Sequence, residues 1–161
     1  MLTLGIDPGT AIMGYGLVES DGRTLSTPAY GVLTTLKGDS PERRLRQLFD
    51  GLSALIALHQ PEAVAVEELF FNVNVRTALA VGQARGIALL VAARADLAVY
   101  SYTPLQVKSA VVGYGKAVKE QVQVMTTTLL NLPAVPHPDD AADALAVAIC
   151  HAHSARLLAR R

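Results

Sequence analysis

The sequence predicts a single α/β domain, residues 1–161, in which one mixed β-sheet is flanked by helices. Three apolar segments near the N-terminus are separated only by short turns, a pattern typical of an antiparallel meander. Two more short apolar segments follow, each preceded by a stretch with helical periodicity, which is typical of parallel strands reached by helical crossovers. The chain has no internal repeat and no linker, so its 161 residues suit one domain of ordinary size.

The three N-terminal segments form the predicted meander. The first strand is expected over 2–6 (LTLGI) and the second over 12–18 (IMGYGLV), with an Asp-Pro-Gly turn at 7–9 between them. An Asp-Gly pair then marks the next turn, and a third strand continues to about Thr35.

Helices and two further strands account for the rest of the chain. Ser40 and Pro41 form a good helix start, because serine caps the first turn and proline fits the first helical position. Apolar residues then recur at three- and four-residue spacing, which predicts an amphipathic helix over 41–59. The remaining elements are expected in this order: strand 63–68, helix 74–95, strand 97–102, and helices 104–112, 117–131 and 138–158. This succession is that of the ribonuclease H-like architecture, with a five-stranded mixed sheet.

The composition excludes several classes of protein. The residues are 51% hydrophobic and 17% charged, which is not the balance of a disordered chain. The apolar runs are interrupted before they reach the roughly 20 residues that span a bilayer, so no membrane segment is expected. The N-terminus lacks the regions of a signal peptide, and Cys150 is the only cysteine. We therefore expect a protein of the reducing cytoplasm.

Charge is distributed unevenly along the chain. The net charge is zero, which argues against non-specific binding of nucleic acid. Three of the four lysines nevertheless lie close together, at Lys108, Lys116 and Lys119, while acids gather at 139–143. This asymmetry is compatible with a basic surface beside an acidic pocket, and equally with ordinary solvated helix faces.

Two of the predicted strands end on acidic residues. Asp7 follows the first strand, and Glu67 or Glu68 ends the fourth. The carboxyl ends of neighbouring strands are common places for functional residues in open sheets. Taken alone, Asp7 is also compatible with a turn former, and the glutamates with solvent-exposed residues.

The last helix carries the other acids. Asp140 and Asp143 share a face, and so, almost as well, do Asp139 and Asp143. Asp139 and Asp140 also suit the helix dipole without any site, whereas Asp143 lies on an apolar face where an unpaired carboxylate is costly. Carboxylates without histidine or cysteine partners suit Mg²⁺ or Mn²⁺. Two such ions, roughly 3.5–4 Å apart, can serve phosphodiester hydrolysis, so the acids together favour a metal site.

Five ordered motifs resemble a known family over nearly the whole chain. They are GIDPGT…GYG at 5–16, VEELF at 66–70, GQARG at 82–86, QVKSAVVGYGKAVKEQV at 106–122 and DAADALAVAICHAH at 140–153. The sequence resembles the RuvC family of crossover junction endodeoxyribonucleases, which resolve Holliday junctions. The resemblance implies paired symmetric nicks that leave 5′-phosphate and 3′-hydroxyl ends. It also implies two Mg²⁺ or Mn²⁺ ions per active site, held by Asp7, Glu67, Asp140 and Asp143.

The resemblance also implies residues for DNA and several partners. Phe70 matches an aromatic that the family uses against a base near the junction centre, and Phe71 beside it could share or take that role. Lys108 and Lys119 match lysines linked to DNA binding, and Lys116 fits a phosphate contact. The implied partners are four-way junction DNA, a second copy of the chain, and the branch-migration proteins RuvA and RuvB. The implied location is cytoplasmic and nucleoid-associated.

Departures from the family and competing interpretations remain. Thr10 and Ala11 stand where many relatives have a serine and a basic residue, and Asp139 leaves open which of two adjacent acids reaches the metal. An actin-like kinase or ATPase lobe also opens on an aspartate-glycine loop, but it needs two related lobes. A junction-binding scaffold without catalysis is a third possibility. GYGKAVKE lacks the spacing of a phosphate loop, and we interpret Cys150 and its neighbouring histidines as structural.

Overall fold

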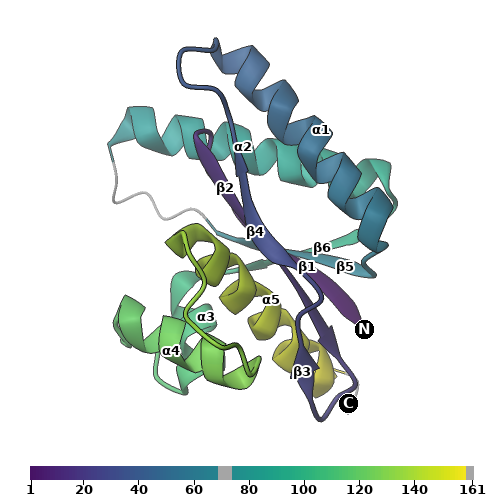
Figure 1. The fold of residues 1–161 in the computed structure, drawn as a ribbon, viewed down its shortest axis with the longest axis vertical. Coiled ribbons are helices and arrows are strands. Elements are labelled where there is room, and N and C mark those ends of the chain that lie inside the picture. Colours follow the sequence, from purple (N-terminus) through teal and green to yellow (C-terminus); the bar gives the residue numbers. More distant parts are fainter. Residues whose placement is uncertain (69–73, 159–161) are drawn as a thin grey trace.

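The computed structural model describes residues 1–68 and 74–158 (Figure 1). Its strands are β1 (Leu2–Asp7), β2 (Ile12–Ser20), β3 (Leu25–Ser26), β4 (Tyr30–Thr34), β5 (Ala63–Glu67) and β6 (Ala98–Tyr102). Its helices are α1 (Pro41–His59), α2 (Val75–Arg94), α3 (Pro104–Val112), α4 (Lys119–Leu129) and α5 (Asp139–Leu158). All the predicted elements are present, with most ends within one or two residues of those expected. The predicted ribonuclease H-like arrangement is confirmed.

The strands form one mixed sheet in the order β3-β2-β1-β5-β6, with β4 also paired to β2. The meander pairs are antiparallel, whereas β1 with β5 and β5 with β6 are parallel. The single third strand expected from the sequence is wrong in one respect, because the structure divides it into β3 and β4. Pro28 lies between the two and has no amide hydrogen for a ladder, so the pairing is interrupted there.

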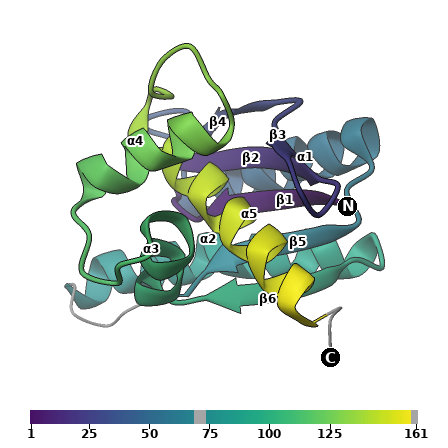
Figure 2. The same ribbon diagram turned by 90° about the horizontal axis from the view of Figure 1, so that it is seen from below.

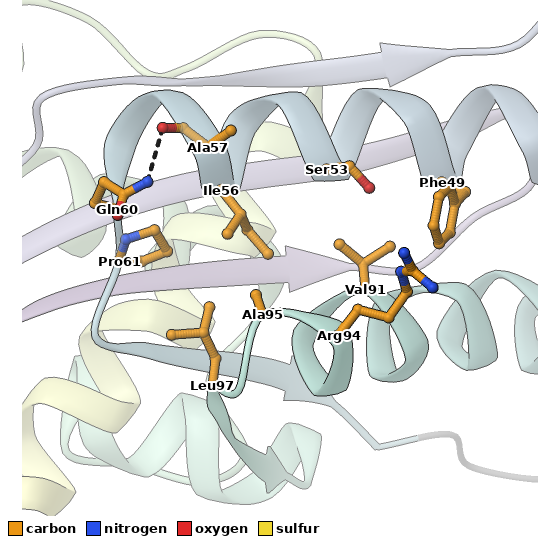
Figure 3. Close-up of a pocket in the computed structure, with 10 residues that line it drawn as sticks. All are labelled: Phe49, Ser53, Ile56, Ala57, Gln60, Pro61, Val91, Arg94, Ala95 and Leu97. Carbon is orange, nitrogen blue, oxygen red and sulfur yellow. Dashed lines mark hydrogen bonds between the residues drawn. The ribbon is translucent and has the colours of Figure 1, made fainter.

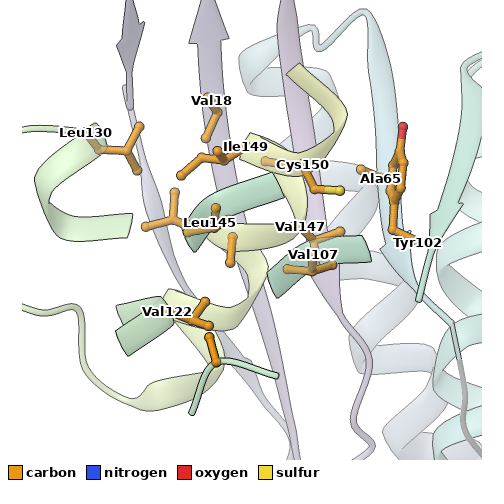
Figure 4. Close-up of a cluster of buried hydrophobic side chains, with 14 residues drawn as sticks. Val18, Ala65, Tyr102, Val107, Val122, Leu130, Leu145, Val147, Ile149 and Cys150 are labelled. Carbon is orange, nitrogen blue, oxygen red and sulfur yellow. The ribbon is translucent and has the colours of Figure 1, made fainter. Parts of the chain in front are cut away.

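Helices cover both faces of the sheet (Figure 1). On one face α1 and α2 bury a core with Leu4, Ile6, Val64 and Val66 of the central strands. On the other face α5 runs obliquely across the strands, with α3 and α4 packed beside it (Figure 2). The core under α5 contains Leu145 and Ile149 of that helix (Figure 4). Alternate residues of β1 and β5 therefore face opposite layers, as the period of a strand requires.

Three strand glycines allow α5 to lie directly on the sheet. A Cβ at Gly5 would overlap the carbonyl oxygen of Ala144, and one at Gly14 would overlap that of Asp140. A Cβ at Gly16 would meet the side chain of Leu145 at 2.7 Å. The glycines of the first motif therefore serve chiefly as a smooth platform for the helix, where the sequence had indicated a tight turn.

The exposed side of α2 is unusually apolar. Among the described helices, α2 is the one long and apolar enough, by length and composition, to cross a membrane. The core helix of a soluble protein passes the same test, and α2 packs Ala84, Ala88, Val91 and Ala92 into the core. Val75, Leu79 and Leu90 of the same helix stay exposed.

Candidate active site

Two of the predicted site residues lie side by side at one edge of the sheet. Asp7 is the last residue of β1 and Glu67 the last residue of β5. The two strands are parallel, and Ile6 pairs with Val66, so Asp7 and Glu67 follow the same rung of the ladder. Both occupy the face that α5 covers, because they alternate with core residues of the opposite layer. Glu68 is exposed, so of the two adjacent glutamates Glu67 is the one that belongs to this cluster.

The start of α5 brings the remaining acids to the same edge. Gly14 pairs with Asp7 across the β1–β2 ladder and also contacts the backbone of Asp140, so the first turn of α5 lies beside the tip of β1. Asp143 follows one turn later, and its charge acts on both Asp7 and Glu67. The predicted convergence of Asp7, Glu67, Asp140 and Asp143 is thus present. We call these four residues the carboxylate cluster.

The pKa values of Asp7, Glu67 and Asp143 are all raised, because these carboxylates are shielded from water and lie close to like charges. Burial, followed by the charges of Asp143, Glu67 and Asp140, raises the pKa of Asp7 to about 8. Burial and the charge of Asp143 raise the pKa of Glu67, against the opposing influence of Lys108 and Lys119. Burial also raises the pKa of Asp143, although Lys119 opposes the shift. Carboxylates that repel one another in this way gain from a cation among them.

In the structure the ammonium of Lys119 supplies a positive charge beside these carboxylates. The Nζ atom of Lys119 lies 3.0 Å from Oδ2 of Asp143 and 3.3 Å from Oδ2 of Asp139. Burial alone would lower the pKa of Lys119, but its hydrogen bonds and its attraction to Asp143 and Asp139 raise it. Asp139 and Asp140 both act on Asp143, but Asp139 pairs with Lys119 whereas the charge of Asp140 also acts on Asp7. Of the two adjacent acids, Asp140 is therefore the one whose charge affects the acid at the tip of β1.

A cavity of about 230 Å³ opens beside the cluster. It is lined by Glu67, Asp143, Lys108 and Lys119 on its polar side and by Pro104, Val107, Val122 and Ala146 on its apolar side. Lys108 comes from α3, whose start is fixed by a capping box between Thr103 and Gln106. Lys116 is exposed in the loop before α4 and does not line this cavity.

The donor chemistry of the cluster fits a hard divalent cation, because all four side chains offer carboxylate oxygens. Within residues 1–68 and 74–158, however, no group of three or more His, Cys, Asp or Glu side chains is arranged so that it could hold a metal ion as it stands. Loading a metal therefore requires the carboxylates to move closer together, and Asp143 can bind it only if the ammonium of Lys119 gives way.

Other predicted residues lie elsewhere. Phe70 and Phe71 fall outside the described residues. Cys150 is buried, and Nδ1 of His153 lies 3.0 Å from the carbonyl oxygen of Ala110, in line with the structural interpretation of this motif. A second cavity, of about 520 Å³, lies between α1 and α2 (Figure 3). No carboxylate lines it, and Arg94 stacks over Phe49 at its edge.

One buried polar pair was not found from the sequence. The hydroxyl of Tyr102 lies 2.8 Å from Nδ1 of His151, which is 2% exposed, and the ring of Tyr100 packs on the same histidine. Tyr102 pairs with Glu67 across the β5–β6 ladder, so this contact fastens α5 to the strand beside the cluster. Tyrosine in an alternating strand is usual, and nothing in the pattern singled it out.

Known proteins share both the sequence and the fold. A family model described as crossover junction endodeoxyribonuclease RuvC matches residues 3–151. A relative of that name from Heliobacterium modesticaldum is 62% identical over 154 residues, covering 96% of this chain and 95% of the relative. The solved structure of Thermus thermophilus RuvC is 38% identical, with a TM-score of 0.90 over 98% of this chain and 96% of that one.

A second solved structure includes DNA. It is Thermus thermophilus RuvC in complex with a Holliday junction substrate. It is 35% identical, with a TM-score of 0.89 over 98% of this chain and 96% of that one. These findings support the nuclease interpretation of the sequence and not the kinase alternative. The chain belongs to the RuvC family of crossover junction endodeoxyribonucleases.

Proposed function

We propose that this chain is a structure-selective endonuclease that resolves four-way DNA junctions by paired symmetric nicks. The observation that carries the proposal is the carboxylate cluster at the edge of the sheet, with Lys108 and Lys119 directly beside it. Half-buried carboxylates next to cations suit a reaction that handles a charged phosphate. The junction substrate comes from the resemblance and from the complex of the Thermus thermophilus relative.

The cluster residues are proposed to hold two divalent cations, Mg²⁺ or Mn²⁺. Such ions supply a Lewis acid that activates water and offsets charge on the phosphate. Asp7 is suited to the central position, because a strand tip in the middle of a sheet is rigid. Glu67 is held one strand away, and Asp140 and Asp143 complete the set from α5. The products would carry 5′-phosphate and 3′-hydroxyl ends, which a ligase can seal.

The lysines are proposed to position the DNA. Lys108 and Lys119 line the cavity beside the cluster, where an ammonium can reach a backbone phosphate near the cut without reading sequence. Lys116 is exposed nearby and suits a more distant phosphate. Phe70 and Phe71 come three and four residues after Glu67 in the sequence, and one of them is proposed to stack on an unpaired base, an interaction worth about 1–3 kcal/mol.

Paired nicks require two active sites, and α2 supports a homodimer. Val75, Leu79 and Leu90 are 83%, 64% and 50% exposed. With Gly82 and Gly86 between them they form one stripe at helical spacing. A Cβ at Gly86 would meet nothing in the chain, so a second backbone could approach closely there. We propose that the α2 helices of two copies pair through this stripe, as in the two-fold dimers common among soluble proteins.

The wider setting follows from the same resemblance. We propose that the dimer acts with the branch-migration proteins RuvA and RuvB on nucleoid DNA in the cytoplasm. This part of the proposal rests on family membership.

A cleavage assay tests the proposal. A labelled synthetic four-way junction is incubated with wild-type protein or Asp7→Asn, each with and without Mg²⁺ or Mn²⁺. The matched control is Asp50→Asn, which neutralises an exposed carboxylate of α1. We expect symmetric, ligatable nicks from the wild type and Asp50→Asn only with metal, and junction binding without cutting from Asp7→Asn. Cutting by Asp7→Asn, or a need for ATP, contradicts the mechanism. Binding without cutting by the wild type identifies a scaffold.

A further inference from the structure

Lys119 begins α4 at the mouth of the carboxylate cluster and is held there by two acids of α5. Asp143 and Asp139 lie one helical turn apart and approach the same Nζ atom, at 3.0 and 3.3 Å. The two acids differ in burial, because the side chain of Asp139 is 52% exposed and that of Asp143 is 30% exposed. Lys119 is thus shared between one acid inside the cluster and one at its rim.

This arrangement is more than an ordinary surface ion pair. Exposed pairs contribute little, because water screens the attraction. Here, however, Asp143 also faces the negative charges of Asp7, Glu67 and Asp140, so the ammonium offsets a repulsion that the fold itself creates. A divalent cation on Asp143 and the ammonium of Lys119 would compete for the same carboxylate. Asp139 would not be contested, because it points to the rim.

We propose that Lys119 is an exchangeable counter-ion: it neutralises Asp143 while no metal is bound, and Asp139 holds it at the site when a divalent cation takes its place. The inference rests on the proposed metal site and assigns Asp139 as a positioning residue for Lys119. Metal loading then releases Lys119 from Asp143 beside the cavity where a DNA phosphate is expected. The ammonium of Lys119, still paired with Asp139, becomes available to that phosphate.

Titration of the DNA-free protein with Mn²⁺, followed by calorimetry or by the electron paramagnetic resonance signal of free Mn²⁺, tests the exchange without any activity readout. Removing a competing charge should tighten metal binding, and coupling between sites typically changes affinity by about 5- to 150-fold. For this partly exposed pair we expect Lys119→Gln to bind Mn²⁺ about 5- to 10-fold more tightly than the wild type. Lys119→Arg, which keeps the charge, and Lys116→Gln, which removes one outside the cluster, should both stay within about twofold of the wild type.

A double-mutant cycle tests the role of Asp139. Asp139→Asn should weaken Mn²⁺ binding severalfold in the wild-type background, because Lys119 then pairs with Asp143 alone. In the Lys119→Gln background the same change should have little effect. Equal, large losses in both backgrounds would make Asp139 a metal ligand and overturn its positioning role.

The two proposals fail in different ways. If the wild type binds no Mn²⁺ and cuts no junction, the proposed metal site is wrong, and the exchange is wrong with it. If the wild type binds Mn²⁺ and cuts junctions while Lys119→Gln binds the metal no more tightly, only the counter-ion role is overturned. Thermal unfolding of each metal-free variant confirms that it is folded before titration.

Discussion

The backbone carbonyl of Asp140 packs directly on the α-carbon of Gly14, the residue that pairs with Asp7 in the sheet. The contact joins residues 126 positions apart and sets the first turn of α5 beside the tip of β1. The location of the carboxylate cluster therefore depends on a glycine that carries no chemistry of its own.

Gly14→Ala should displace the start of α5, because the added methyl group overlaps backbone that cannot turn aside. Overpacking of this kind costs about 1–3 kcal/mol of unfolding free energy. We expect that loss in urea denaturation, together with a large loss of junction cleavage.

Gly51→Ala is the matched control for this change. Its Cβ would meet only the flexible end of Leu33 at 3.0 Å, and alanine favours the helix interior by about 1 kcal/mol. The two effects oppose each other, so the free energy of unfolding of Gly51→Ala should stay close to that of the wild type. Equal behaviour of the two variants would show that the close approach at Gly14 is not required.

Asp7 should make the metal-free protein less stable as the pH rises. Its pKa is about 8 in the folded chain, against an ordinary value of 3.8, so the folded state holds a proton that the unfolded state has lost between these values. Stability associated with Asp7 is full below pH 4 and falls as the pH approaches 8.

Asp7→Asn removes this dependence. In the absence of metal, its unfolding midpoint relative to the wild type should rise steadily from pH 5 to pH 8. Thermal unfolding in buffers containing a chelator measures the difference. A constant difference across this range would contradict the raised pKa of Asp7.

Tyr102→Phe should destabilise the protein by about 1–3 kcal/mol, because it leaves Nδ1 of the buried His151 without its partner. Tyr100→Phe is the control, since the stacking of its ring on His151 is preserved. Chemical denaturation of the two variants separates the hydroxyl contact from the packing. Equal stability of both variants would argue against the hydrogen bond as an anchor of α5.

Leu79→Glu should convert the proposed dimer to a monomer, because it places a charge on the apolar stripe of α2. Light scattering coupled to gel filtration measures the mass. Leu58→Glu changes a leucine of α1 that is also well exposed, at 74% against 64% for Leu79, and should leave the mass unchanged. A dimeric Leu79→Glu would place the contact between copies on another surface.

Local patterns predicted most of the fold, because turns, helix caps and periodicity are properties of neighbouring residues. The start of α1 at Pro41 and that of α3 at Pro104 follow from such signals. The break at Pro28 could have been predicted from its missing amide, but the surrounding apolar residues favoured one continuous strand.

The sequence predicted which residues belong to the candidate site, but not which of their side chains contact one another. Asp143 stands out as an acid on an apolar helix face, and Asp7 and Glu67 as acids at the ends of apolar strands, whereas Asp140 is assigned by the family resemblance. Their role as metal ligands stays a prediction. The pairing of Lys119 with Asp139 depends on how α4 packs against α5, and no local pattern encodes that.

The parallel register of β1 and β5 limits how this candidate active site can vary. Asp7 and Glu67 are anchored on adjacent strands, whose separation of roughly 4.8 Å is set by backbone hydrogen bonds common to every sheet. Substitutions in the core can tilt or shift α5, and with it Asp140 and Asp143. They leave the distance between the backbones of Asp7 and Glu67 unchanged. Changes of metal preference among related chains should therefore be sought in the helix half of the site.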